Sequence, residues 1–480
     1  MSLMVPVALF GWIPVVLLLF AALPSRRAML TAFFAAWMFL PNTGYHVEGL
    51  PAYTKMSATA LGVLLATAMF DPNRLFSLRL SKLDIPMIVW WLCPMASSLS
   101  NDLGVYDGLS AVFQQAVTWG IPYAIGRMYL RSLDDLRELA VALFVGGLVY
   151  TPFCLWEVRM SPQLNQWVYG FGGTGTEYAQ ELGKWGSRPH VFMGTALAVG
   201  LFMTAATLSG LWLWTSGAIR RVGRFAAGPA VAWLAGITVL CKNMEALALL
   251  VAGVGALFTA KWLHTRVLVL ALVAAAPAYM FLRATGIWSG DSLVALSSLV
   301  HERRGQSLQS RITNDGMLVE RALQKPVFGW GGWGRARVYE EDWKGDLVDV
   351  AVMDGLWIIA LGNTGLVGLT AITAAMLLPA ALVLYRLAKR TWWQPTAAPA
   401  VVLATLVVLY ALDNLFNAML NPIYVVTAGA LTNLCLVIRV AAAAPLAAQQ
   451  ARVWPAVPAG PDARYVAATG RRRKPVTKTL

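Results

Sequence analysis

Apolar runs separated by short polar connections repeat along almost the whole chain. A helix needs about 20 apolar residues to cross a hydrocarbon core about 30 Å thick, although helices within a bundle are often shorter or broken. The pattern therefore predicts an all-α polytopic membrane protein with about 12–14 transmembrane helices. The predicted segments are residues 3–23, 28–40, 57–70, 84–99, 109–126, 139–157, 190–214, 227–241, 244–260, 266–282, 355–384, 397–414 and 422–440.

The polar interruptions divide the chain into four parts. Residues 1–282 are predicted to form an N-terminal transmembrane bundle that contains a medium loop, 159–187. A long polar loop, 283–353, precedes the C-terminal transmembrane helices in 354–440. Residues 441–480 combine Pro, Ala and a basic run, which predicts a disordered cytoplasmic tail.

Composition supports the membrane assignment and limits the function. The 480 residues are 58% hydrophobic and 13% charged, whereas soluble domains carry about a quarter charged residues. The net charge of +14 is high enough to suggest a nucleic-acid partner. The basic residues, however, fall in short clusters between apolar runs, a pattern that sets membrane topology, so no nucleic acid is predicted. The four cysteines lie in or beside apolar runs without close pairing, and no metal site is predicted.

Basic residues occupy every second connection, which orients the chain. Because cytoplasmic loops carry an excess of Lys and Arg, these connections are predicted to face the cytoplasm. The medium and long loops then face the opposite side. The basic connections contain Arg26, Arg27, Arg74, Arg79, Lys82, Arg127, Arg131, Arg137, Arg220, Arg221, Arg224, Lys261, Arg266, Arg386, Lys389 and Arg390.

The long loop contains the stretch RITNDGMLVERALQKPVFGWGGWG, which starts at Arg311. Apolar residues at helical spacing predict an amphipathic helix from Ser307 that ends before Pro326, because a residue before proline resists the helical region. The glycines of the following turn permit positive φ and close backbone approach. Two interpretations stay open for this turn, namely contact with a ligand and an aromatic corner packed against the protein.

Three arginines of the long loop, Arg303, Arg304 and Arg311, form a candidate phosphate site. Positive charge on the non-cytoplasmic side opposes the usual bias, and a guanidinium group suits bidentate phosphate binding. The alternative is that these arginines only solvate an exposed helix.

The order Arg311, amphipathic helix, KPVFGWGGWG, Asp354-Gly-Leu-Trp and Gly365-Leu-Val-Gly resembles the bacterial O-antigen polymerase and O-antigen ligase superfamily. The resemblance implies a GT-C-like glycosyltransferase in the bacterial inner membrane, with its active site facing the periplasm. It implies transfer of a glycan from an undecaprenyl pyrophosphate carrier without a cofactor or metal. The implied partners are the lipid-linked oligosaccharide, membrane lipid and other polysaccharide assembly proteins such as a chain-length regulator.

The resemblance also assigns roles to residues. It places Arg311 and Arg188 on the pyrophosphate, with Lys242 as a deeper partner. The charge of the long loop adds one of Arg303 and Arg304 to this set. Ligases of the superfamily usually carry His-Asn where this chain has Asp354-Gly355. This departure favours a polymerase that adds glycan to another lipid-linked repeat unit.

Asp354 is the leading candidate for a catalytic base, since partial burial at the start of an apolar helix would raise its pKa. A helix cap is its alternative role. His190 is the alternative base. Lys242 and Glu245 interrupt two apolar runs, where ionisable groups are costly and often functional, although a simple ion pair between them also fits. Asp413, Asn414, Asn417 and Asn421 form a second polar group, for which helix capping is the favoured interpretation.

Two other functions stay open. One is an O-antigen ligase or an O-oligosaccharyltransferase that moves the glycan to a lipid or protein acceptor. The other is a flippase for the lipid-linked oligosaccharide. A transporter is expected to carry polar residues along a path open to both sides, with repeated halves. This chain gathers its polar residues toward one face, which favours an enzyme.

Overall fold

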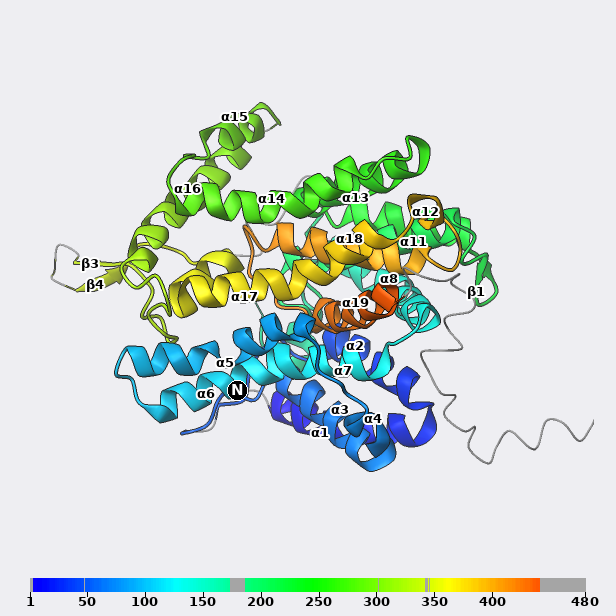
Figure 1. The fold of residues 1–480 in the computed structure, drawn as a ribbon, viewed down its shortest axis with the longest axis horizontal. Coiled ribbons are helices and arrows are strands. Elements are labelled where there is room, and N and C mark those ends of the chain that lie inside the picture. Colours follow the sequence, from blue (N-terminus) through cyan, green and yellow to red (C-terminus); the bar gives the residue numbers. More distant parts are fainter. Residues whose placement is uncertain are drawn as a thin grey trace, which may run out of the picture. The chain divides into compact units, whose positions relative to one another are not determined.

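Helices form at all thirteen of the predicted apolar segments in the computed structural model (Figure 1). The structure describes residues 3–46, 48–172, 186–300, 302–341, 344 and 346–440. The chain divides into two units, Met1–Cys435 and Leu436–Leu480. The predicted tail, 441–480, lies outside the described residues.

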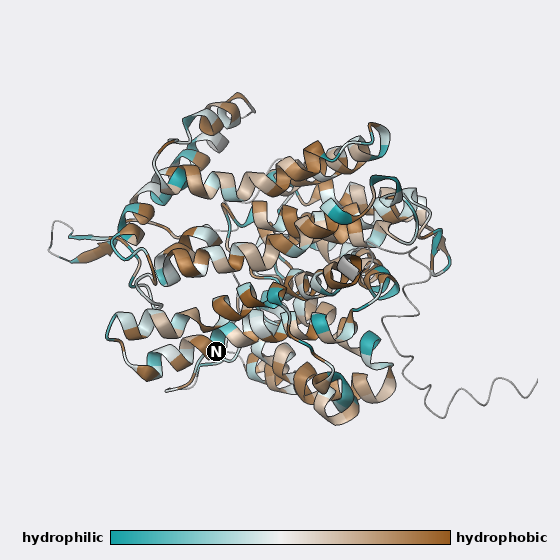
Figure 2. Ribbon diagram, viewed as in Figure 1, coloured by the Kyte–Doolittle hydropathy of each residue, from teal (hydrophilic) through white to brown (hydrophobic). Residues whose placement is uncertain are grey.

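Seven helices within the described residues are long and apolar enough to cross a membrane. The chain is therefore a helical membrane protein, as predicted, but seven helices of the described residues meet this criterion where the sequence predicts about 12–14. Apolar residues dominate these helices in Figure 2. The seven spans are α1 (Met4–Ala22), α5 (Ile85–Ser100) with the preceding 3-10 turn η1 (Lys82–Asp84), α8 (Leu133–Met160), α11 (Ala196–Thr215), α13 (Met244–Trp262), α14 (Val267–Ala284) and α17 (Leu356–Arg386). Four shorter apolar helices are α3 (Lys55–Phe70), α12 (Ala227–Leu240), α18 (Ala398–Asp413) and α19 (Pro422–Val440).

The remaining elements connect or complete these helices. They are α2 (Ser25–Phe39), α4 (Pro72–Phe76), α6 (Val105–Gln115), the π-turn η2 (Ala116–Gly120), α7 (Ile121–Tyr129), α9 (Leu164–Tyr169), α15 (Asp291–Val300), α16 (Glu302–Leu323) and the 3-10 turn η3 (Lys389–Thr391). Two antiparallel hairpins pair β1 (Arg221–Val222) with β2 (Phe225–Ala226) and β3 (Tyr339–Glu341) with β4 (Leu347–Asp349).

The basic connections meet at one end of the first unit, as the alternation of charged loops predicts. The Arg137 guanidinium donates to the carbonyl of Ala218 at 2.9 Å, and Arg127 donates to the carbonyl of Arg79 at 2.8 Å. Arg266 donates to the carbonyl of Leu387. In Figure 1, α4 and β1 lie toward this end, whereas α15, α16, β3 and β4 of the long loop lie at the other end.

The long loop contains more structure than the sequence indicates. The predicted amphipathic helix is confirmed as α16, and its residues Ile312, Leu318 and Val319 are buried. The predicted start at Ser307 is too late, since α16 begins at Glu302. The additional helix α15 and the hairpin of β3 and β4 were not predicted, because their short stretches carry no clear apolar period.

The glycine-rich turn after α16 packs against a kink in α17 through its backbone, while the Trp333 side chain is 71% exposed. Backbone hydrogen bonds join Trp330 N to Gly362 O at 2.8 Å and Leu366 N to Pro326 O at 2.7 Å. Gly365 interrupts α17 with φ 65° and ψ −164°, a conformation that favours glycine. The Gly/Trp turn is therefore a joint that fixes the long loop to a membrane helix.

Replacing Gly365 by alanine is expected to destabilise this joint by about 3 kcal/mol, because the conformation is strained for an L-residue and the space is filled. A Cβ atom at Gly365 would lie 2.4 Å from the carbonyl oxygen of Val327. A thermal unfolding curve of the purified protein in detergent measures the effect. Gly332→Ala is the matched control, since no atom lies within 4 Å of a Cβ placed there. Equal melting temperatures for the two variants would contradict this account.

Candidate functional site

Arg311 lies at the centre of a polar cluster where α16 meets the ends of α13, α17 and α18. Its Nη1 donates to the carbonyl of Phe416 at 3.2 Å and to Oδ1 of Asn417 at 3.4 Å. Glu245 Oε2 lies 3.8 Å from Nη1, and Asp354 Oδ2 lies 3.9 Å from Nε. Within the described residues, Nη1 is the donor of both hydrogen bonds that Arg311 makes. Because Nε faces Asp354, Nη2 is the guanidinium nitrogen that is available to a ligand.

Arg188 and Arg311 act on the same carboxylate, although they come from distant parts of the sequence. Glu245, in the first turn of α13, interacts electrostatically with both guanidinium groups. Glu245 also accepts a hydrogen bond of 3.0 Å from the Asn417 amide. Arg188 Nε is buried and has no hydrogen-bond partner among the described residues. The cluster thus combines two cations and leaves donors of both unengaged.

The segment that carries Arg188 is held by a buried carboxylate. Glu157, near the end of α8, is 0% exposed. It accepts backbone hydrogen bonds from His190 at 2.8 Å, Val191 at 2.7 Å and Leu164 at 3.1 Å. These bonds keep residues 186–195 out of a helix, so α11 begins at Ala196 and the predicted start at residue 190 is wrong. The role of Glu157 was not predicted, since its only signal in the sequence is an acidic residue inside an apolar run.

Lys242 and Glu245, which are close in the sequence, bind different partners in the structure. Lys242 donates its Nζ to the carbonyl of Gly186 at 2.6 Å, and Glu245 pairs with Arg311, so the alternative of a Lys242–Glu245 ion pair is wrong. Lys242 therefore lies beside the Arg188 segment. His190 interacts electrostatically with Glu157, and its imidazole belongs to that side of the cluster.

Asp354 is an ion-pair partner of Arg311 and does not cap α17. The N-cap of α17 is Gly355, and no side chain caps this helix. The Asp354 side chain is 41% exposed, so its burial is only partial, as predicted. A carboxylate that is open to solvent and 3.9 Å from an arginine is well placed to meet a bound substrate.

Asp315 adds a buried carboxyl group that the sequence analysis missed. It follows Arg311 by one turn of α16 and is only 4% exposed. Its Oδ2 accepts a hydrogen bond of 3.2 Å from the hydroxyl of Tyr279 in α14. The Tyr279 ring makes edge contacts with Trp288, Trp357 and Phe416, which keep water from this carboxyl group.

Burial raises the pKa of Asp315 to about 7, and the nearby Asp354 carboxylate adds to the rise. The Tyr279 hydroxyl and the guanidinium groups of Arg283 and Arg311 act in the opposite direction. Arg283 also ties α14 to α16 through a bond of 2.7 Å to the carbonyl of Ile312. The protonation state of Asp315 is therefore coupled to the packing of α16, the helix that carries Arg311, against α14.

The stability of the protein is expected to fall as the pH rises from about 4 to about 7. The pKa of Asp315 in the fold lies above its ordinary value of 3.8, so the folded protein keeps a proton that the unfolded chain has released. Above about pH 7 this contribution is constant. Melting temperatures in detergent between pH 4 and 8 measure the slope. Asp315→Asn removes the titrating group, and an unchanged slope in that variant would contradict the assignment.

Of the four polar residues near the end of α18, Asp413 and Asn417 belong to this cluster. Asn421 has the predicted capping role, since it accepts a hydrogen bond of 3.0 Å from the backbone N–H of Ile423 at the start of α19. Asn417 bridges Glu245 and Arg311, and Asp413 interacts electrostatically with both. Asn414 donates to the carbonyl of Tyr410 at 2.7 Å. Arg303 and Arg304 fall in the first turn of α16, but their side chains lie outside the described part of the chain.

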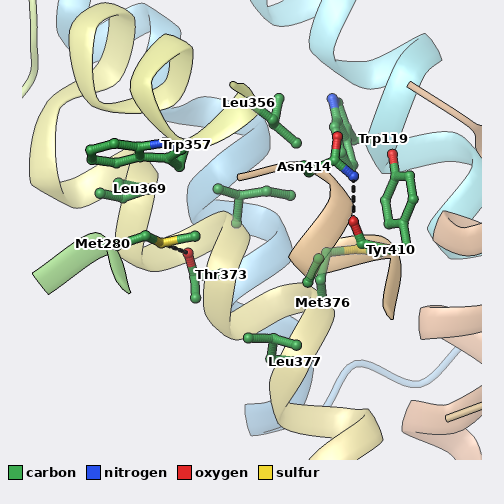
Figure 3. Close-up of a pocket in the computed structure, with 12 residues that line it drawn as sticks. Trp119, Met280, Leu356, Trp357, Leu369, Thr373, Met376, Leu377, Tyr410 and Asn414 are labelled. Carbon is green, nitrogen blue, oxygen red and sulfur yellow. Dashed lines mark hydrogen bonds between the residues drawn. The ribbon is translucent and has the colours of Figure 1, made fainter. Parts of the chain in front are cut away.

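An apolar cavity of about 40 Å³ adjoins the cluster between α14, α17 and α18 (Figure 3). Its walls include Trp357, Met376, Met280 and Tyr410, and Asn414 lies at its edge. A space of this size holds a few water molecules at most. The cavity is therefore a packing defect beside the cluster and is too small and apolar for a diphosphate.

The fold and the cluster define a helical membrane protein with a polar site at the end opposite its basic connections. No protein-family model matches the chain, and a comparison with curated proteins finds no match.

Proposed function

We propose that this protein is a polysaccharide polymerase of the O-antigen polymerase and ligase type, with a GT-C-like architecture. Its donor would be an oligosaccharide on undecaprenyl pyrophosphate, and its acceptor the end of another lipid-linked repeat unit. The proposal places the protein in the bacterial inner membrane and the site on the periplasmic face. The basic connections at the opposite end of the fold support this orientation.

The observation that carries the proposal is that Glu245 lies 3.8 Å from the Arg311 guanidinium and also interacts electrostatically with Arg188. Fixed guanidinium groups suit the diphosphate of a lipid-linked sugar, because they bind phosphate oxygens in pairs. The ion pairs of Arg311 are 3.8 and 3.9 Å long, beyond hydrogen-bond distance, so a diphosphate can replace these partners at small cost.

The reaction needs one proton acceptor and one anionic leaving group. The acceptor hydroxyl oxygen attacks the anomeric carbon while the bond from that carbon to the pyrophosphate oxygen breaks, which inverts the configuration. Asp354 takes the hydroxyl proton. Arg188 and Arg311 stabilise the charge that develops on the departing pyrophosphate, which fixed cations achieve without a metal.

A polymerase is preferred to a ligase because Asp354 and Gly355 stand where ligases carry His-Asn. The gathering of charged side chains at Arg311 supports an enzyme over a flippase, which needs a polar path through the membrane.

Incubation of the purified protein with an undecaprenyl pyrophosphate oligosaccharide tests the proposal. A ladder of products is expected. A single transfer to an added lipid or peptide acceptor would instead show a ligase or oligosaccharyltransferase. Movement of the donor across vesicles without any glycosidic product would overturn the enzyme assignment.

A further inference from the structure

A groove of about 790 Å³ lies between α2 and α8, away from the cluster at Arg311. Its walls are apolar and include Leu30, Phe34 and Met38 of α2 and Val141 and Val145 of α8. The part of α2 that lines the groove extends from Arg27 to Phe39, which spans about 18 Å along a helix. One leaflet of a membrane core is about 15 Å thick, so the groove is long enough for an acyl chain.

Three arginines line this groove at the basic end of the fold, namely Arg27, Arg137 and Arg221. A hydrogen bond of 2.9 Å from Arg137 to the carbonyl of Ala218 fixes α8 to the connection that carries Arg221. Glu138 also lines the groove, but Arg26 binds both of its carboxylate oxygens, at 2.7 and 2.8 Å. Arg26 also pairs with Asp135, so one cation is shared by two carboxylates. With Arg27, Arg137 and Arg221 included, four arginines face these two carboxylates, and the net charge at this end of the groove is positive.

We propose that this groove binds an anionic phospholipid from the surrounding membrane. One acyl chain lies along α2 and α8, and the phosphate group meets Arg27, Arg137 and Arg221. The groove has apolar walls along its length and guanidinium groups at one end. A phospholipid has an apolar acyl chain that fits the walls and a phosphate that fits the guanidinium groups. Basic pockets between transmembrane helices commonly bind acidic lipid head groups. The inference rests on the membrane fold and is independent of glycosyl transfer.

Charge favours a lipid over a second copy of the chain as the occupant. The chain carries a net charge of +14, and the groove ends at its basic side. A second copy would bring further positive charge to three arginines, whereas an anionic lipid brings the opposite charge.

Native mass spectrometry of the full chain in detergent tests the proposal with two probes, dioleoyl phosphatidylglycerol and dioleoyl phosphatidylcholine. The wild-type protein is expected to retain phosphatidylglycerol preferentially. The affinity of the Arg27→Gln/Arg221→Gln variant for phosphatidylglycerol should be about 30-fold lower than that of the wild-type protein, which corresponds to about 1 kcal/mol for each arginine. Arg224→Gln/Arg390→Gln is the matched control, because these exposed arginines do not line the groove. Equal losses in the two double variants would refute a specific site.

A second variant tests the acyl-chain part of the site. Ala142 lines the groove and is half-buried, so Ala142→Trp should fill the space and lower retention of both lipids. The melting temperature of each variant without added lipid shows whether it has folded. Full retention of phosphatidylglycerol in the folded Ala142→Trp variant would overturn the proposal. Dimerisation of the wild-type protein that blocks lipid binding would also overturn the proposal. The same holds if glycerol phosphate binds as tightly as the intact lipid.

Discussion

Arg311→Ala is expected to reduce the rate of glycan transfer by about 100- to 1,000-fold, the cost of removing one preorganised charge-stabilising donor. Arg311 pairs with Glu245 and Asp354 and donates to Asn417 from a single side chain, so its loss removes a cation from the site and one ion pair from each of the two carboxylates. The assay is product formation from an undecaprenyl pyrophosphate oligosaccharide at saturating donor.

Arg337→Ala is the matched control for Arg311. Arg337 also belongs to the long loop, but it pairs with Asp349 at 2.7 Å on the exposed hairpin. This variant should keep wild-type activity, and both variants should express at wild-type levels. Arg311→Lys should recover part of the rate, since an ammonium keeps the charge but loses the bidentate geometry. Undiminished transfer by Arg311→Ala would remove Arg311 from the mechanism.

Glu157→Ala is expected to cost about 3 to 5 kcal/mol of stability, because three backbone N–H groups would lose their acceptor in a buried site. The same bonds fix the segment that carries Arg188. Transfer activity should therefore fall even under conditions in which the variant remains folded. Thermal unfolding in detergent measures the stability, and single-turnover transfer below the melting temperature measures the activity.

Glu157→Gln separates the two effects. Its amide oxygen can take the place of Oε2, which accepts from both His190 and Val191, so the variant should be more stable than Glu157→Ala. Glu138→Ala is a control from the same helix, since Glu138 is more exposed and pairs with Arg26 at the basic end. A Glu157→Ala protein that melts at the wild-type temperature would show that these bonds do not support the fold.

Hydropathy along the chain was sufficient to predict where helices form, because the apolar character of a segment is a local property. The alternation of basic connections likewise predicted which loops share an end of the fold. The resemblance pointed to Arg311 and Arg188, and both interact electrostatically with Glu245 in the structure. In each case the signal lies within a short stretch of sequence.

Local sequence patterns did not predict the partners of the buried polar groups. Glu157 accepts from backbone groups 33 and 34 residues away, and Arg311 meets Asn417 across 106 residues. Nothing in the local pattern marks Asp315 as buried, since its burial depends on Tyr279 and on the rings around it.

The sequence by itself determined that this is a chain of membrane helices with basic connections at one end and an arginine-bearing helix in a long loop at the other. Only the tertiary structure decided that Glu245 pairs with Arg311, that Asp354 leaves the capping of α17 to Gly355, and that the glycine-rich turn is a joint with α17. The reason is physical. Helix formation in a membrane follows from the solvation of each segment, whereas the partner of a buried charge depends on which distant segments the packing brings together.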